Sequence, residues 1–315
     1  MTVHILYCII GLLLLVLGGE WLVRGSVGIA QRLRLSPMVI GLTVVSFGTS
    51  APEFIVSLQA ALDGSSGIAL GNVIGSNIAN VALILGVTAI LCPIPVAGGT
   101  LKVDTPLLLV ASVLLALCCH FTHALTRLEG MVGFAIMLAY VALQVVHSRK
   151  HSTDGGSETA AGAPPKLPIA LAYVLLAVIA LKYGAGWLVD GASEIAHAAG
   201  VSDRVVGLTV VAIGTSLPEL FASVVAARKG SVDMAVGNAI GSNLFNLLGV
   251  LSASAAISPI TGISSAFAAD CIWMIALTLL IWLLMRTDYR LTRTEGCLLL
   301  AVYAVYVVLA AWYGF

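Results

Sequence analysis

Two glutamates stand out because each follows a pair of hydroxyl residues and a proline inside a strongly apolar stretch. Glu53 ends the segment Gly-Thr-Ser-Ala-Pro-Glu that begins at Gly48, and Glu219 ends Gly-Thr-Ser-Leu-Pro-Glu, which begins at Gly214. On a helix, Thr49 lies one turn before Glu53 and shares its face. An ionisable side chain within a membrane-length apolar segment is costly, so each glutamate indicates a functional site.

The side chains near these glutamates offer only oxygen ligands. The next apolar segment adds Asn72, Ser76 and Asn80, which are four residues apart and share one helix face. Carboxylate, hydroxyl and amide oxygens suit hard cations, Ca²⁺ above all, with Na⁺ as a competitor. The residues that we expect at such a cation site are Thr49, Ser50, Glu53, Ser76 and Asn80, with Thr215, Ser216, Glu219, Ser242 and Asn246 in the second copy.

The two prolines predict breaks in their helices. Pro52 has no amide hydrogen, so the carbonyl of Gly48 loses its helical partner and the helix kinks. Pro218 repeats the arrangement. Discontinuous transporter helices coordinate Na⁺ through carbonyls freed in this way. For one copy alone, a kinked structural span whose hydroxyls cap these carbonyls is an equally good interpretation, and the repetition favours the ion site.

The repetition extends along the whole chain at a constant offset of 166 residues, the separation of Glu53 and Glu219. The segment 71–80 is echoed by 237–246, and Asp104 by Asp270. Such self-similarity indicates an internal duplication. Each copy also has two glycines four residues apart, which predict close approach of a neighbouring helix: Gly71 and Gly75, then Gly237 and Gly241.

Composition places the chain in a membrane. Of its 315 residues, 60% are hydrophobic and 10% charged, with a mean hydropathy of +1.07. Soluble domains carry about 25% charged residues. The net charge of 0 gives no basic face for nucleic acid, and the six cysteines lack paired metal-site spacing. Without a phosphate-binding glycine loop, ATP-driven pumping is not expected either.

The apolar segments predict an all-α integral membrane protein with ten transmembrane helices. Five spans per half is an odd number, so the second half enters the membrane from the opposite side and forms an inverted repeat. The domains are then 1–147, a flexible linker over 148–167, and 168–315. The predicted spans are 3–23, 38–62, 68–92, 104–121 and 128–147, followed by 168–189, 205–227, 233–258, 268–285 and 294–314.

Lysine and arginine concentrate in the odd-numbered loops, which places these loops and the linker in the cytoplasm and both termini outside it. The chain is then a multi-pass protein of the cell membrane. Within the spans, Lys182 is matched by Val16 in the first half, and we interpret it as a side chain that snorkels to the interface, apart from the site. Asp104 and Asp270 begin spans and are expected to cap helices.

The paired signatures closely resemble the repeats of the sodium/calcium exchanger family, within the cation/Ca²⁺ antiporter group. The motifs are those ending at Glu53 and Glu219, with Gly-Ser-Asn at 75–77 and 241–243. The likeness spans nearly the whole chain and is strongest with compact prokaryotic members. It implies that Glu53 and Glu219 ligate Ca²⁺ directly, assisted by Thr49 and Thr215.

The resemblance also implies two Na⁺ sites beside the calcium, with Asn80 and Asn246 in the middle. Some members have an aspartate in place of Asn246, and its absence here makes potassium co-transport unexpected. One Na⁺ site would use Thr49, Ser76, Glu219 and the carbonyl of Ser46. The other would use Thr215, Ser242, Glu53 and the carbonyl of Ala212.

The function implied is Na⁺/Ca²⁺ antiport, in which the inward Na⁺ gradient drives Ca²⁺ export as the first helices of both halves move. One Ca²⁺ or two Na⁺ neutralise the two glutamates, and a further Na⁺ makes exchange electrogenic. No enzyme activity, cofactor or protein partner is expected, only the two ions and the bilayer. The alternatives are Ca²⁺/H⁺ antiport on the same scaffold, a cation channel, and an intramembrane hydrolase, for which no nucleophile beside a histidine or paired aspartate is apparent.

Overall fold

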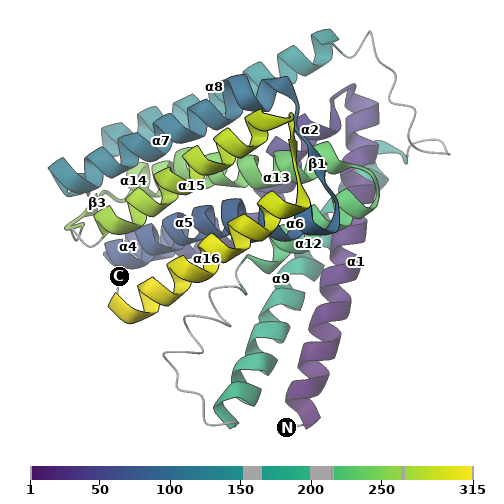
Figure 1. Ribbon diagram of the computed structural model, residues 1–315, viewed down its shortest axis with the longest axis horizontal. Helices are drawn as coiled ribbons and strands as arrows, with labels where there is room; N and C mark the ends of the chain where they lie inside the picture. The colour runs from purple at the N-terminus through teal and green to yellow at the C-terminus, as the bar shows by residue number, and fades with distance from the viewer. Residues whose placement is uncertain (1, 152–164, 199–213, 215, 264–266, 314–315) are drawn as a thin grey trace.

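The computed structural model describes residues 2–151, 165–198, 214, 216–263 and 267–313. These residues are helical except for connecting turns and four two-residue strands (Figure 1). The helices of the first half are α1 (Thr2–Leu33), α2 (Pro37–Ile40), η1 (Gly41–Val45), α3 (Ser46–Thr49), α4 (Ala51–Leu62), α5 (Ser66–Ala79), η2 (Asn80–Ile84), α6 (Leu85–Leu91), η3 (Thr100–Asp104), α7 (Thr105–Leu117), η4 (Cys118–Thr122) and α8 (Arg127–His151). Those of the second half are α9 (Leu167–Ala198), α12 (Leu217–Arg228), α13 (Val232–Leu244), η6 (Phe245–Leu251), α14 (Ser252–Ile257), α15 (Phe267–Thr287) and α16 (Arg293–Tyr313).

Several of these helices are long enough to cross a bilayer. Eight helices within the described ranges have the required length and hydropathy, and the bent pair 37–49 and 51–62 makes a ninth. The chain is therefore an all-helical protein with eight or nine candidate spans. Of the predicted span 205–227, only residues 214 and 216–227 fall within the described residues, and most of these belong to α12.

The first helix of each half is longer than its apolar run predicts. α1 ends at Leu33 rather than near residue 23, and α9 ends at Ala198 rather than near residue 189. Helices of about 3–35 and 168–200, which we expect to be the moving elements, agree with these bounds. The apolar runs end earlier, although neither Glu20 nor Arg24 interrupts the backbone hydrogen bonds of α1. A charged residue ends a hydrophobic pattern without ending the helix, since glutamate and arginine have good helix propensity.

α1 and α9 lie side by side and project from the other helices (Figure 1). Glycines allow the antiparallel contact. A Cβ atom on Gly11 would lie 2.7 Å from the carbonyl oxygen of Gly184, and one on Gly25 would lie 2.7 Å from that of Ala170. Backbones meet this closely only where side chains are absent. The second half repeats the contact, because a Cβ atom on Gly191 would lie 2.6 Å from the carbonyl oxygen of His4.

α13 packs against the segment formed by α2 and η1. Cβ atoms on Gly237 and Gly241 would lie 2.5 Å from the carbonyl oxygen of Met38 and 2.6 Å from the Cα of Leu42, respectively. The close approach predicted for this glycine pair is confirmed. For Gly75, no described atom lies within 4 Å of such a Cβ. Its counterpart contact would involve residues 208 and 212, which lie outside the described ranges.

Two short antiparallel pairs join the halves at their loops. β1 (Ile94–Pro95) pairs with β4 (Arg290–Leu291), and β2 (Ala124–Leu125) pairs with β3 (Ile260–Thr261). The duplication relates β1 to β3, yet these two strands lie at opposite ends of the long helices (Figure 1). Each strand therefore pairs with a loop of the other half.

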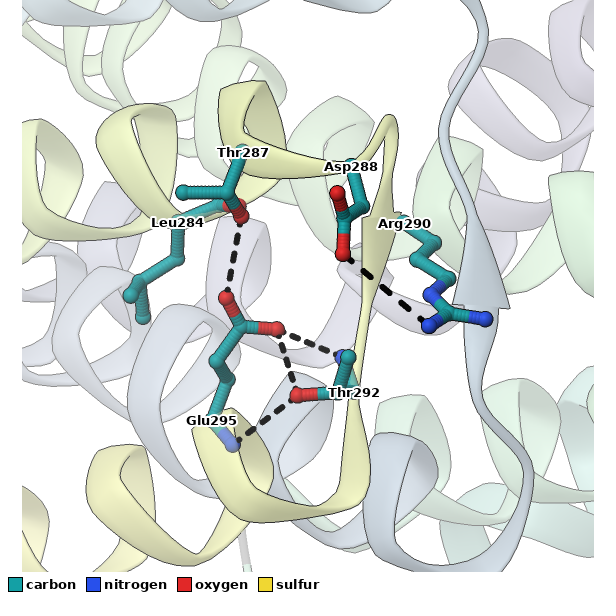
Figure 2. Close-up of polar contacts among 6 residues, drawn as sticks. All are labelled: Leu284, Thr287, Asp288, Arg290, Thr292 and Glu295. Carbon is teal, nitrogen blue, oxygen red and sulfur yellow. Dashed lines mark hydrogen bonds and ion pairs between the residues drawn. The ribbon is translucent and has the colours of Figure 1, made fainter.

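The helices that follow these loops begin with a matched capping arrangement. Glu295 accepts hydrogen bonds from the backbone amide and hydroxyl of Thr292, both at 2.7 Å, and the Glu295 amide donates to the Thr292 hydroxyl at 3.3 Å (Figure 2). Thr126 and Glu129 repeat these contacts at the start of α8. This capping box satisfies amides that the first helical turn leaves unpaired.

The capping role expected of Asp104 was wrong. Its side chain makes no cap hydrogen bond, and instead accepts one from Tyr140 at 2.8 Å and another from Gln144. Asp270 likewise accepts from Tyr306 at 3.2 Å. Asp104 lies inside a helix that continues from Thr100 as a π turn, so it has no free first-turn amides to cap. Both aspartates join neighbouring spans.

Candidate cation site

The chain breaks its helix immediately before each glutamate segment. Ser50 has φ −85° and ψ 8°, and Ser216 has φ −91° and ψ 4°, so both leave helical geometry at the same position of the motif. The axes on either side of Ser50 differ by 52°. The predicted kink is confirmed there. Each new helix begins with its proline in the first turn, where no amide donor is needed, and carries its glutamate in that turn.

The two halves meet at these breaks. The Ser50 hydroxyl donates to Oε1 of Glu219 at 3.1 Å, and the Thr49 hydroxyl lies 3.4 Å from Oδ1 of Asn238. The Ser46 hydroxyl donates to the backbone carbonyl of Asn238 at 3.0 Å. Hydroxyls of the first half thus contact the carboxylate and amide of the second, residues more than 160 positions away in the sequence.

Two amides hold the glutamate helices in place. Asn72 donates from Nδ2 to the carbonyl of Glu53 at 3.1 Å and to Ser57 at 2.8 Å. Asn238 does the same for Glu219 at 3.3 Å and for Ser223 at 2.9 Å. Each asparagine thus ties the first turn of a glutamate helix to the neighbouring helix. This positioning role was not predicted, and the available signal for it was the repeated serine four residues after each glutamate.

A second set of amides joins α5 to α13 at the centre. Asn77 donates to the carbonyl of Asn243 at 3.4 Å, and Asn243 donates to the carbonyl of Asn77 at 3.1 Å. Asn80 donates to Oδ1 of Asn243 at 2.9 Å. A π-helical turn follows each of these helices. The turn after α5 begins at Asn80, and the turn after α13 begins at Phe245 and includes Asn246. Such wide turns are common at functional sites.

Several oxygens around the glutamates are buried without a hydrogen-bond partner. Glu53 is 3% exposed and Glu219 is 1% exposed. In the described part of the chain, neither has an ion-pair partner. Two carboxylates in low dielectric without counter-charge favour binding of positive charge. The site atoms that are buried and unpartnered are Glu53 Oε2, Glu219 Oε2, Ser216 Oγ, Ser242 Oγ, Asn80 Oδ1, and both Oδ1 and Nδ2 of Asn246.

The other predicted residues are buried at the same place with their hydroxyl protons engaged. Thr49 donates to Val45 at 3.1 Å, and Ser76 donates to the carbonyl of Asn72 within its own helix. Their oxygens keep lone pairs for a cation. The carbonyl of Ser46 accepts the Ser50 amide at 2.9 Å, so helix geometry already uses one of its lone pairs. Thr215 and Ala212 lie outside the described residues.

One side of this site opens into a cavity of about 190 Å³. Glu53, Asn72 and Pro218 line it together with residues of α9. The mirrored side is closed by α1, where a Cβ atom on Gly19 would lie 3.1 Å from the carbonyl oxygen of Phe221. This cavity thus adjoins Glu53 and not Glu219, although the local geometry of the two glutamates is alike.

Comparison with known proteins agrees with this geometry. The model of the sodium/calcium exchanger protein family matches residues 3–146 and 169–312. The chain belongs to the sodium/calcium exchanger family. The resemblance found in the sequence is thereby confirmed, and membership supports cation/Ca²⁺ antiport as the activity of a multi-span membrane protein.

Relatives in this exchanger family match the chain nearly end to end. A putative antiporter, CaxA, of Alkalimonas amylolytica is 40% identical over 97% of this chain and 98% of its own. The sodium/calcium exchanger MaX1 of Methanosarcina acetivorans is 33% identical, covering 98% of both chains. The solved structure of the sodium-calcium exchanger NCX_Mj, soaked without Na⁺ or Ca²⁺, is 32% identical with a TM-score of 0.83, over 98% of this chain and 99% of that one.

Proposed function

We propose that this chain is a Na⁺/Ca²⁺ antiporter that exports Ca²⁺ by alternating access, driven by the inward Na⁺ gradient. The observation that carries the proposal is the pair of buried, uncompensated carboxylates of Glu53 and Glu219 among unpartnered oxygens. One Ca²⁺ supplies the two positive charges that this site needs. Oxygen ligands of this kind are those that Ca²⁺ and Na⁺ accept.

The site residues act in two groups. Glu53 and Glu219 bind Ca²⁺ with Thr49 and Thr215, while Ser50 and Ser216 support the carboxylates. The Na⁺ sites share these glutamates, so Na⁺ and Ca²⁺ occupy the centre alternately. They add Ser76 and Ser242 and the carbonyls of Ser46 and Ala212, with Asn80 and Asn246 between them.

The architecture proposed for this mechanism is ten helices in two inverted repeats, 1–147 and 168–315, joined by the linker 148–167. Support comes from the strand pairs, because β1 and its duplicate β3 lie at opposite ends of the helices. The mirrored glycine contacts of α1 and α9 support it as well. With the linker and the other odd-numbered loops in the cytoplasm, both termini lie outside.

Alternating access follows from the unequal packing of α1 and α9. α1 covers the Glu219 side, whereas α9 leaves the cavity beside Glu53. Because both helices pack mainly on each other, they can move as a pair across the remaining helices. That movement would close the Glu53 side and open the Glu219 side, without exposing both at once.

The first test uses purified protein in Na⁺-loaded liposomes and measures uptake of radiolabelled Ca²⁺ into the liposomes from Na⁺-free medium. We expect uptake that needs the Na⁺ gradient, and that falls below about a tenth in Glu53→Gln or Glu219→Gln, since a hydrogen bond or ligand contact to a charged group contributes about 1.5–3 kcal/mol. Glu129→Gln is the matched control, because glutamine preserves its capping box outside the site. Uptake driven by a pH gradient and indifferent to Na⁺ would replace this proposal with Ca²⁺/H⁺ antiport.

A further inference from the structure

Lys182 lies near the middle of α9, with more than roughly 20 Å of helix on either side of it. The predicted span 168–189 also places Lys182 within the hydrocarbon core, which is about 30 Å thick. A charged side chain there needs a protein partner or a water-filled cavity. Snorkelling of the exposed Lys182 side chain stays a prediction, whereas its place on the cavity lining beside Glu53 argues against a position apart from the site.

The structure supplies such a cavity. Lys182 lines the same space of about 190 Å³ as Glu53 and Asn72, and Asp190 lies two turns further along α9 on the same lining. Within the described residues Lys182 forms no ion pair, and its ammonium lies 5.9 Å from the centre of the Tyr183 ring. The positive charge is thus not neutralised by direct contact and acts on whatever enters the cavity.

The duplicated passage lacks this charge. The counterpart of Lys182 in α1 is Val16, and that of Asp190 is Arg24. Glu20, whose counterpart in α9 is Gly186, lies 3.7 Å from Lys229 on the closed side. The two routes to the site therefore share their carboxylate ends and differ in the charges that a cation meets on the way.

We propose that Lys182 is a selectivity residue of the passage to Glu53, which disfavours Ca²⁺ relative to Na⁺ on that face and makes the two faces unequal in apparent Ca²⁺ affinity. This inference rests on the proposed exchange function. Electrostatic energy scales with ionic charge, so the Boltzmann factor against Ca²⁺ is the square of the factor against Na⁺. Low-dielectric walls strengthen the effect by focusing the field.

In the proposed topology α9 runs outward from Lys182 to Asp190, so the guarded face is the extracellular one. A weaker apparent affinity for Ca²⁺ there suits an exporter, because Ca²⁺ that has been released outside is less able to rebind. The electrostatic repulsion from Lys182 is smaller for Na⁺ than for Ca²⁺ at the same entrance. The unpaired lysine would then favour the forward direction kinetically, while the ion gradients alone set the equilibrium.

The test compares right-side-out with inside-out membrane vesicles that contain the full chain, with initial rates of Ca²⁺ uptake measured against Ca²⁺ concentration. In Lys182→Met, which removes the charge and keeps the length, we expect half-saturating Ca²⁺ to fall about three- to tenfold in one vesicle orientation only. Half-saturating Na⁺ should fall by about the square root of that factor. Lys182→Arg keeps the charge and is expected to retain the original values.

Equal shifts in both orientations, equal shifts for Na⁺ and Ca²⁺, or no shift would overturn the role of Lys182. Val16→Lys is the reciprocal variant, and we expect it to raise half-saturating Ca²⁺ in the opposite orientation. The unaltered protein separates the two hypotheses in the same vesicles. If the unaltered protein exchanges Na⁺ for Ca²⁺ and Lys182→Met changes nothing, only this inference fails. If the unaltered protein shows no Na⁺-dependent Ca²⁺ uptake, both the proposed function and this inference fail.

Discussion

At the scale of single residues, the site consists of charges and oxygens that the folded chain itself leaves unsatisfied. Glu53 Oε2, Glu219 Oε2 and the Asn246 amide have no partner among the described residues. Burying such groups costs free energy unless a ligand completes them. The neighbouring amides that do find partners, Asn72 and Asn238, hold the glutamate backbones instead. Different residues of the site thus have different roles: some offer unpartnered atoms to an ion, and others hold the backbone in place.

Ser50 gives a residue-scale prediction. Its hydroxyl donates to Glu219 across the interface between the halves at 3.1 Å. In Ser50→Ala the carboxylate loses this donor, and we expect half-saturating Ca²⁺ in the liposome assay to rise about tenfold, as the loss of a hydrogen bond to a charged group implies. Ser112→Ala is the control, because this buried serine donates only to Leu108 within α7. An unchanged value in Ser50→Ala would show that the contact does not support the ion site.

At the scale of elements, glycine decides which helices cross closely. The α13 glycine Gly237 faces the backbone of Met38, and Gly41 on the opposite segment faces that of Met234, in both cases with room for no Cβ atom. Backbone atoms cannot rotate away as a side chain can. The crossing brings Asn238 to Thr49 and Ser46, so the same glycines that allow close packing also set the geometry of the site.

Gly237→Ala is therefore expected to destabilise the protein. The new methyl group would lie 2.5 Å from the Met38 oxygen, and overpacking of this kind costs about 1–3 kcal/mol. Gly98→Ala is the control, since no described atom lies within 4 Å of a Cβ atom at this exposed helical position. The thermal unfolding midpoint in detergent should fall for the first variant and hold or rise for the second. Equal midpoints would mean that α13 has room to shift.

At the scale of the whole molecule, two halves with the same site motifs are packed unequally. Among the described residues, α1 packs closely beside Glu219, whereas a cavity lies between α9 and Glu53. A carrier needs this asymmetry, because access from both sides at once would let ions leak along their gradients. The pairing of loops between halves ties the remaining helices together, and we propose that α1 and α9 move against this frame.

Charge balance at the site gives a prediction at this scale. If three Na⁺ leave for each Ca²⁺ that enters, one net charge crosses the membrane per cycle, and it is worth about 2.3 kcal/mol per 100 mV. In Na⁺-loaded liposomes, an inside-positive potential set by external K⁺ and valinomycin should accelerate Ca²⁺ uptake. The same K⁺ without valinomycin is the control. Uptake that is indifferent to the potential would indicate two Na⁺ per Ca²⁺.

The linear order of residues was sufficient for the features that depend on spacing along the chain. Apolar length indicated the spans, the constant offset between Glu53 and Glu219 indicated the duplication, and Pro52 indicated the kink. It was insufficient at the ends of α1 and α9, because hydrophobicity ends before the helical hydrogen bonds do. It was also insufficient for Asp104. The apolar run begins at this residue, but the helix already begins at Thr100, so Asp104 lies within the helix and not at its start.

The sequence by itself determined that this is a duplicated, membrane-spanning chain with two carboxylates and an oxygen-rich motif around each. Only the tertiary structure decided that Ser50 meets Glu219, that Asn77 and Asn243 join the halves, and that Lys182 lines the same cavity as Glu53. The physical reason is that spacing places a side chain on a face of its own helix. Which faces then meet depends on helix rotation and crossing, and these are set by close backbone contacts between segments far apart in the chain.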